Sequence, residues 1–363
     1  MKKITKLVAI TFFASMSFAL SAQSVSITNT FGGDEDNLSG NDFLIFDKDG
    51  DKEDTHISDR LQLDVKSEHL DSRVRFNFDA SGNKSGKGTN VQTQGYVNLR
   101  PVQPLNIIVG NKFFAKWAMA PSYLCAVDDN LVGGKLTGDN GAAVVFDMKG
   151  FQAAAGVGYE SKLDANFGLA YTLEDVFSVG ATLQNATENA RTVSAYAGLL
   201  AVENLTFNAG YGYHLTENND YLNDNDEEST LAFEHAAILT VGYEFPDLGL
   251  YLAADGIFSL TDKVYDSISD STAELLDEDE NKVFPIFAAL YASYGINDAW
   301  TIACRGKALF LGKNYIASVY PHFEFETTVG KFTSGVRFLF DSEADGFNGF
   351  SIPFCWIYKF KVL

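Results

Sequence analysis

The sequence predicts an all-β fold: a transmembrane antiparallel up-and-down β-barrel of about 18 strands, with 16 as the alternative number. Three observations carry this prediction. Apolar and polar residues alternate with a period of two from end to end, while a helical period is nearly absent. Each alternating stretch has the roughly nine to twelve residues that a tilted strand needs to cross a bilayer. The connections between the stretches are short and long in turn.

The N-terminal segment has the order of a secretory signal peptide. Lys2, Lys3 and Lys6 precede an apolar run from Leu7 to Leu20, which is followed by the small residues Ser21 and Ala22. We expect residues 1–22 to be the signal peptide and residues 23–363 to form the barrel. After this segment no apolar run approaches the 18 residues of a transmembrane helix.

Composition excludes several classes of protein. The chain without its first 22 residues keeps 24 basic and 48 acidic residues, a net charge of −24, which is opposite to the basic surface that nucleic-acid binding requires. Three cysteines in an exported chain are too few for a disulfide scaffold. The 30 Phe and 16 Tyr residues argue against a disordered acidic chain, and export argues against a cytoplasmic enzyme.

The alternation is clearest from Ser72 to Asp79. Val74 and Phe76 point to one face there, and Arg73 and Arg75 point to the other. The predicted strands are 24–31, 56–66, 72–80, 91–100, 104–113, 141–148, 151–159, 164–172, 176–185, 192–200, 204–214, 233–245, 249–259, 284–294, 298–310, 315–326, 330–340 and 350–361.

The connections divide into two sets. Short ones alternate without exception with longer polar ones, although 160–163 and 311–314 are only marginally long. A transmembrane barrel has this arrangement, with tight periplasmic turns and extended outer loops. The strand number is even and both termini fall on the short-turn side, which predicts a periplasmic location for both.

A soluble β-sandwich or solenoid also alternates with a period of two, and it is the alternative fold. Aromatic residues at strand ends favour the barrel, because Tyr and Trp prefer the membrane interface. These residues are Tyr159, Tyr171, Tyr213, Tyr243, Phe245, Tyr294, Trp300, Phe310, Tyr315 and Phe325.

The C-terminal stretch from Phe350 to Leu363 resembles the last strand of Gram-negative outer-membrane proteins of the porin type. Those proteins end in alternating hydrophobic residues closed by an aromatic residue, which the barrel-assembly machinery recognises. Phe360 stands in the place of that closing aromatic, and Tyr358 and Trp356 precede it. The overhang of Lys361, Val362 and Leu363 departs from the pattern. The resemblance implies an outer-membrane location, lipid and the assembly machinery as partners, and leaves a homo-oligomer open.

The predicted lumen face is asymmetric. Basic residues fall on the inward face of the first strands and the last strands, which are neighbours in a closed barrel, whereas the strands over 151–200 place almost no basic residue there. The predicted pore-lining residues are Arg60, Arg73, Arg75, Arg100, Lys112, Arg305, Lys307 and Arg337, with Lys66, Lys331, Lys359 and Lys361 on the same face.

The connection 114–140 is the third outer loop. In general porins this loop folds inward, and its acidic residues face basic residues across the pore. The resemblance implies such a constriction between Asp128 and Asp129 and the three arginines Arg73, Arg75 and Arg100. A field of this kind orients dipolar solutes and sets ion preference. The alternative is a wet polar interior without a focused constriction.

Acidic residues are concentrated in the long connections. The oxygens of Asp47, Asp49, Asp51 and Asp54 have a spacing that can wrap a Ca²⁺ ion, although the pattern is not an EF-hand. A solvated acidic loop is the alternative, and no other cofactor is expected. The clusters 224–228 and 277–280 add to an acidic outer mouth.

Passive diffusion of small hydrophilic solutes is the function that follows, because a barrel of this size is too wide for side chains to fill. One alternative is a plugged surface barrel that acts as an adhesin or a structural protein. Another is a transport barrel for hydrophobic solutes, which the absence of an apolar groove on the predicted lumen face disfavours. An enzyme is not expected, since no nucleophile motif accompanies the five histidines and no His and Cys residues have zinc-ligand spacing.

Overall fold

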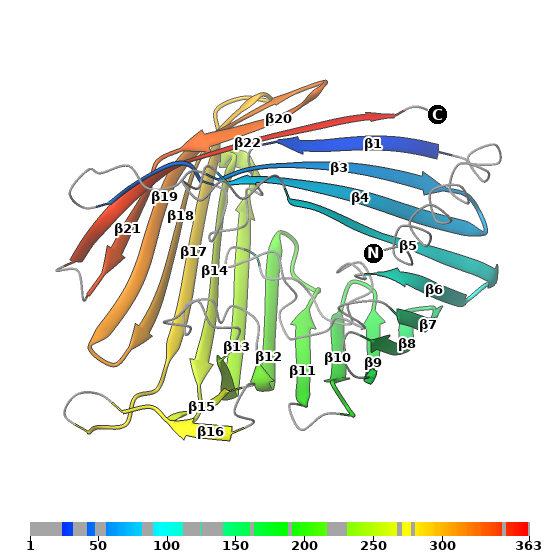
Figure 1. Cartoon of the computed structure of the whole chain (residues 1–363), viewed down its shortest axis with the longest axis horizontal. Coiled ribbons are helices and arrows are strands. Elements are labelled where there is room, and N and C mark those ends of the chain that lie inside the picture. Colours follow the sequence, from blue (N-terminus) through cyan, green and yellow to red (C-terminus); the bar gives the residue numbers. More distant parts are fainter. Residues whose placement is uncertain are drawn as a thin grey trace.

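The strands of the chain form one antiparallel sheet that closes on itself (Figure 1). The computed structural model describes residues 24–31, 42–47, 56–81, 90–111, 124, 141–159, 163–187, 191–215, 231–266, 271–276, 280–342 and 346–361. Closure is made by the first and last strands, since β1 (Ser24–Phe31) pairs with β3 (His56–Lys66) on one side and with β22 (Gly346–Lys361) on the other. Within the described ranges no helix is both long enough and apolar enough to span a bilayer.

The remaining strands follow around the wall in chain order. The first half consists of β2 (Asp42–Asp47), β4 (Leu70–Ser81), β5 (Asn90–Val102), β6 (Leu105–Asn111), β7 (Gly141–Met148), β8 (Phe151–Tyr159), β9 (Leu163–Leu173), β10 (Phe177–Gln184) and β11 (Thr192–Leu199). The second half consists of β12 (Leu205–Leu215), β13 (Leu231–Phe245), β14 (Leu250–Ser259), β15 (Lys263–Asp266), β16 (Ser271–Glu274), β17 (Ile286–Gly295), β18 (Trp300–Leu311), β19 (Asn314–Thr327), β20 (Gly330–Gly335) and β21 (Arg337–Asp341).

Four places in the wall are each filled by two consecutive segments. β1 and β2 both pair with β22, and β14 and β15 both pair with β13. β16 and β17 lie beside β15 and β14, and β20 and β21 both lie between β19 and β22. The wall therefore has the 18 antiparallel strands that the sequence predicts.

The break between β20 and β21 has a chemical cause. The registers His322↔Gly335 and Val319↔Phe338 place Val336 opposite Pro321. Proline has no N–H, so one ladder hydrogen bond cannot form at this level. The hydrogen bond that does form at this level is donated by the Val336 amide to the Pro321 carbonyl, at 3.2 Å.

Alternation separates two faces of the wall. In β11 the side chains of Thr192, Ser194 and Tyr196 are buried, and those of Val193 and Ala195 between them are exposed. Exposed apolar side chains cover the outer face on every part of the wall, for example Leu169, Leu290 and Ile302. A continuous apolar outer surface of this extent fits a lipid environment.

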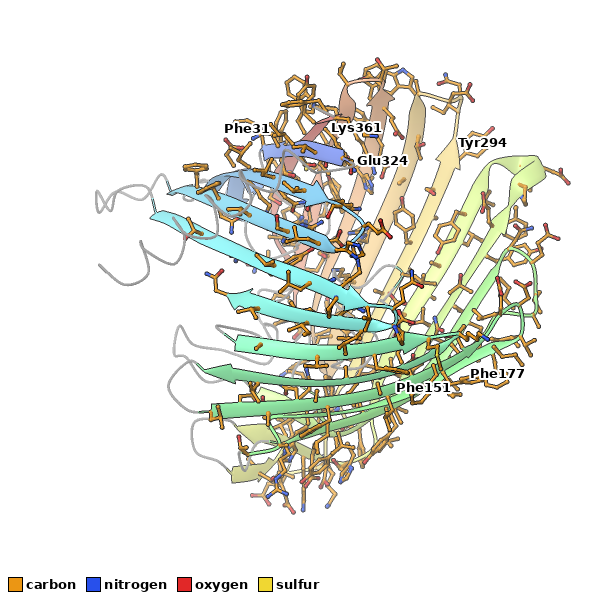
Figure 2. All side chains as sticks on the ribbon, turned by 90° about the vertical axis from the view of Figure 1, so that its right-hand side faces the viewer. Phe31, Phe151, Phe177, Tyr294, Glu324 and Lys361 are labelled. Carbon is orange, nitrogen blue, oxygen red and sulfur yellow. The ribbon has the colours of Figure 1, made fainter. Side chains whose placement is uncertain are left out.

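The two rims of the barrel differ. One rim carries the short connections 67–69, 103–104, 149–150, 174–176, 200–204, 246–249, 296–299 and 328–329. The opposite rim carries the long ones, but 160–162 and 312–313 are as short as the turns of the first rim. Aromatic side chains gather along the short-turn rim, where Figure 2 shows Phe151, Phe177 and Tyr294. Trp300 packs on Phe325 there, with ring centroids 4.5 Å apart.

Strand positions differ from the prediction by more than two residues in three places. β2 lies within the connection predicted for 32–55, and its apolar run has little alternation to reveal it. The hairpin of β15 and β16 lies within the connection predicted for 260–283 and projects beyond the wall (Figure 1). β22 begins at Gly346 instead of residue 350.

Candidate channel lumen

The inward face of the wall is divided into sectors. We call the inner face of β3, β4 and β5 the polar arc, because its cross-strand neighbours carry charged and amide side chains. We call the inner face of β7 to β12 the small-residue arc. Its buried inward positions include Ala143, Ala154, Gly156, Asn166, Gly168, Ala170, Thr182, Ser194, Gly198 and Gly212. The sectors follow from the residues that the period of two places inward.

Side-chain hydrogen bonds run across the strands of the polar arc. Arg73 Nε donates to Asp64 Oδ1 at 2.6 Å, and Arg75 Nε donates to Gln62 Oε1 at 2.5 Å. Arg60 Nε donates to Asn77 Oδ1 at 3.0 Å. The three arginines thus lie together on one inner wall, each held by a partner on the adjacent strand.

Arg100 lies apart from these three arginines, at the short-turn rim. Its guanidinium donates to both carboxylate oxygens of Asp71, at 2.5 and 3.1 Å, and to the carbonyl oxygens of Ser67 and Glu68. A fork of this kind ties β5 to the turn between β3 and β4. Arg100 therefore stabilises the turn between β3 and β4.

Aromatic and basic side chains alternate on the inner face of β17 to β21, which we call the aromatic–basic row. The Arg305 guanidinium lies 5.4 Å from the centroid of the Tyr291 ring, its cross-strand neighbour. Arg337 lies 5.4 Å from the centroid of the Tyr320 ring. Lys307 is buried on the same face of β18. Cation–π contacts hold these guanidinium groups against the wall.

A second charged group continues the row towards the short-turn rim. Tyr320 and His322 stack with ring centroids 4.4 Å apart, and His322 Nε2 lies 3.6 Å from Glu324 Oε1. Glu324 also forms an ion pair with Lys331 on β20, at 3.2 Å. Lys331 therefore adds less free positive charge to the lumen than its position alone indicates.

Apolar side chains line the lumen on β13 to β18. The inward-facing side chains of this sector pack in one cluster, which includes Ile238, Ile257, Phe287 and Leu309. They are covered from solvent: Phe287 is 1% exposed and Ile257 is fully buried. The expectation that the lumen face lacks an apolar surface is therefore wrong. Apolar residues occupy both faces in stretches such as 286–290, so alternation could not assign them to one side.

One residue of the connection between β6 and β7 is placed on this wall. The Leu124 amide donates to Asp255 Oδ1 at 3.2 Å, and the Leu124 side chain packs against the apolar cluster. Asp255 is 3% exposed and faces the lumen from β14. Leu124 therefore lies inside the barrel, on a wall seven strands away from the two strands that flank its connection.

Several predicted site residues lie outside the described residues. They are Lys112, the constriction residues Asp128 and Asp129, and Asp49, Asp51 and Asp54 of the calcium hypothesis. Asp47 is the last residue of β2. In the part of the chain that the structure describes, no three His, Cys, Asp or Glu side chains gather as a metal site would require.

The three residues of the C-terminal pattern lie in the closing strand. Phe360, Tyr358 and Trp356 pair in register with Ile27, Asn29 and Phe31 of β1. Of the described thiols, Cys304 is exposed on the outer face and Cys355 is buried on the inner face, and neither forms a disulfide. His235 is bonded to Tyr211, with Nδ1 2.6 Å from the tyrosine Oη.

Acidic residues of the lumen were missed in the sequence, among them Asp64, Asp71, Asp255 and Glu324. The prediction considered only the basic residues of the inward face and left out the carboxylates beside them. Asp64 has the same inward parity on β3 as Arg60 and Lys66. Asp71 has the same inward parity on β4 as Arg73 and Arg75, so the sequence could have revealed both carboxylates. The contact between Asp255 and Leu124 joins positions far apart in the chain, and no sequence pattern reports it.

No protein-family model and no curated protein sequence matches the chain. Solved structures of similar fold include OccAB4 of Acinetobacter baumannii, with a TM-score of 0.59 and 9% identity over 94% of this chain and 99% of that one. OccK3 (OpdO) of Pseudomonas aeruginosa has a TM-score of 0.56 and 9% identity over 94% and 96%. OpdK of Pseudomonas aeruginosa, in a structure with vanillate, has a TM-score of 0.55 and 10% identity over 93% and 99%. The chain thus has the fold of outer-membrane porin-type barrels.

Proposed function

We propose that the protein is an outer-membrane channel for the passive diffusion of small hydrophilic solutes, with both termini in the periplasm and no catalytic step. The closed wall of 18 strands is the observation that carries the proposal. A wall of this size encloses a lumen that side chains from the strands alone do not fill. The apolar outer face and the polar arc inside are arranged as an aqueous pore in a membrane requires.

The charges of the lumen support a weak preference for anions. Only β22 and β1 separate the aromatic–basic row from the polar arc in the closed wall. The two sectors together place on one side Arg73, Arg75, Arg305, Lys307 and Arg337. Asp64 offsets part of this charge by pairing with Arg73. The acidic outer connections oppose entry of anions, so the net preference is small.

Conductance of the purified mature protein in a planar bilayer, under a salt gradient, tests the proposal. Discrete and persistent current steps are expected, with a reversal potential of the sign for anions. Vanillate, the molecule in the OpdK structure, serves as an organic anion whose addition to one side reports entry into the lumen. A folded, heat-modifiable barrel that gives no current steps would contradict the proposal.

The second candidate is a plugged barrel with a surface role. The burial of Phe287, Ile257 and Leu309, which face the lumen, favours it because these side chains are covered. A plugged barrel gives no steps in the same experiment. Swelling of proteoliposomes in small sugars separates the two candidates independently, since only an open channel admits the sugar.

A further inference from the structure

His322 has an oxygen acceptor beside each of its two ring nitrogens. Nδ1 lies 3.0 Å from the carbonyl oxygen of Tyr320, and Nε2 lies 3.6 Å from Glu324 Oε1. A neutral imidazole has one N–H and one lone pair, so in that form one nitrogen would turn a lone pair towards an oxygen. The imidazolium has an N–H on both nitrogens and therefore suits both contacts. The surroundings of His322 fit the charged form of the ring.

Aromatic neighbours hold this ring in place. It stacks on Tyr320 with ring centroids 4.4 Å apart and an interplanar angle of 13°, and its centroid lies 6.4 Å from that of Tyr291 on β17. A cation on the face of a tyrosine ring is attracted by the ring quadrupole. The side chain of His322 is 4% exposed and that of Glu324 is 18% exposed. The carboxylate is thus the part of the pair that water in the lumen reaches more easily.

The charged groups around His322 come from its own strand and from the neighbouring strands. They are Arg305 on β18, Lys331 on β20, Arg337 on β21, and Glu324 and Glu326 on β19. The three cations oppose a positive charge on His322. Glu324, which lies at ion-pair distance from Nε2, offsets this repulsion.

Protonation of His322 changes the net charge of the group that it forms with Glu324 and Lys331. Lys331 Nζ lies 3.2 Å from Glu324 Oε2, so two cationic side chains share one carboxylate when the ring is charged. Two positive charges and one negative charge then give +1, and the sum falls to 0 when the ring is neutral. Histidine is the side chain that changes its charge near neutral pH. The charge of this group therefore depends on the pH of the medium in the lumen.

We propose that His322 is a specificity-determining residue of the lumen, and that its imidazolium offsets the charge of Glu324 so that the channel prefers anions more strongly in acid than in alkali. His322 acts on passing ions through Glu324, and it is a positioning residue in that sense. The effect on ion preference rests on the proposed function, whereas the charge state of the pair does not.

NMR spectra of the histidine rings test the pair without reference to conduction. At about pH 6 the signal of His322, assigned by its loss in His322→Gln, is expected to show an N–H on both ring nitrogens. In Glu324→Gln the ring is expected to lose this second N–H at a lower pH, because the compensating carboxylate is gone. Glu326→Gln removes the next carboxylate of the same strand and is the matched control, with a much smaller effect. A ring that is neutral at about pH 6, or equal effects of the two variants, overturns the pair.

Reversal potentials under a salt gradient test the effect on ion preference. From about pH 5.5 to about pH 8.5 the ratio of anion to cation permeability of the unaltered protein is expected to fall by about twofold. His322→Gln has the charge of the neutral ring at every pH, so it should show the lower ratio throughout. His322→Gln combined with Glu324→Gln leaves the charge of Lys331 and should show the higher ratio throughout. His214→Gln removes another buried histidine, on β12, and should keep the pH dependence of the unaltered protein.

The two experiments separate the two failures, and heat-modifiability on a gel establishes that each variant is folded. If the ring of His322 titrates as expected but His322→Gln keeps the pH dependence of the unaltered protein, the role in ion preference is overturned. If the ring titrates as expected and the unaltered protein gives no current, the proposed function fails, and the role in ion preference fails with it, while the pair of His322 and Glu324 stands.

Discussion

Arg73 and Asp64 form an ion pair across two adjacent strands, with Arg73 Nε 2.6 Å from Asp64 Oδ1. The side chain of Asp64 is 11% exposed and that of Arg73 is 20% exposed, so the pair lies against the wall and is screened less than a surface pair. The charge that a solute meets on the polar arc is therefore the sum of arginine and carboxylate. Removing one partner leaves the charge of the other in the lumen.

Neutralising the arginines of the polar arc should move ion preference towards cations. In Arg73→Gln combined with Arg75→Gln, Asp64 loses its cationic partner and adds negative potential to the lumen. The reversal potential in a salt gradient measures the shift. An unchanged reversal potential would show that the polar arc does not line the narrowest part of the pore.

Arg100→Gln is the matched control for that experiment, because Arg100 braces the turn at the rim. We expect little change in reversal potential and a loss of stability of about 1–3 kcal/mol, since Asp71 is buried and loses its bidentate partner. Urea unfolding of the barrel in lipid vesicles measures the loss.

The position of the membrane can be mapped with single arginines on the outer face. Leu290 is 64% exposed in the middle of β17, and Leu248 is 60% exposed in a short turn. Leu290→Arg should cost about 2–4 kcal/mol in a bilayer, and Leu248→Arg about 0–1 kcal/mol, because the penalty depends on depth. Unfolding in vesicles gives both values. Equal costs would place Leu290 outside the hydrocarbon layer.

Loss of the closing aromatic residue, Phe360, is expected to impair assembly of the barrel. Phe360→Ala removes the ring that pairs in register with Ile27 at the junction of the first and last strands. We expect less heat-modifiable barrel in the outer-membrane fraction of expressing cells. Phe347→Ala, at the other end of the same strand and of similar exposure, should assemble normally. A comparable loss in both variants would refute a recognition role for Phe360.

The projecting hairpin should respond to pH through Asp262 and Lys282. The hydrogen bond from Lys282 lowers the pKa of Asp262 below its ordinary value of 3.8, and Asp262 raises the pKa of Lys282 above 10.5. A lowered carboxyl pKa contributes stability that is present above the ordinary pKa and is lost as pH falls through the lower, folded value. The raised amine pKa contributes stability that is lost only as pH rises beyond its folded value.

Amide exchange of Leu275, whose N–H donates to the Asp262 carbonyl, measures this effect. Its protection factor should fall below about pH 4 in the unaltered protein, following the carboxyl titration. Lys282→Met should show weaker protection at neutral pH and a smaller dependence on acid. An identical pH profile in both proteins would contradict the assignment to this pair.

The wall was predictable because a period of two and the length of a membrane-crossing strand constrain each stretch independently. Burial follows the predicted alternation in residues 205–213, where Asn208 and Gly212 are buried and Phe207 and Tyr211 are exposed. Where apolar residues occupied both faces, as around Phe287, alternation could not indicate which side chains point inward. The inner apolar cluster was therefore missed. β15 and β16 are four residues each, which is too short for any periodic signal.

The lumen was less predictable, since it depends on contacts between segments distant in the chain. Arg60, Arg73 and Arg75 were placed inward by parity, but parity gives no information on partners such as Gln62 or Asn77. The hydrogen bond from the Leu124 amide to Asp255 joins a donor and a carboxylate that are 131 residues apart. Such a contact has no local signature.

The pairing of β1 with β22 has a consequence for synthesis. β1 cannot pair with its second neighbour until residues 356–361 of β22 have been made. A chain cut short before residue 356 leaves one edge of β1 unpaired, and an unpaired edge is a template for association with other strands. Completion of the polypeptide is thus a condition of closure, so that premature termination yields an aggregation-prone open sheet instead of a smaller pore.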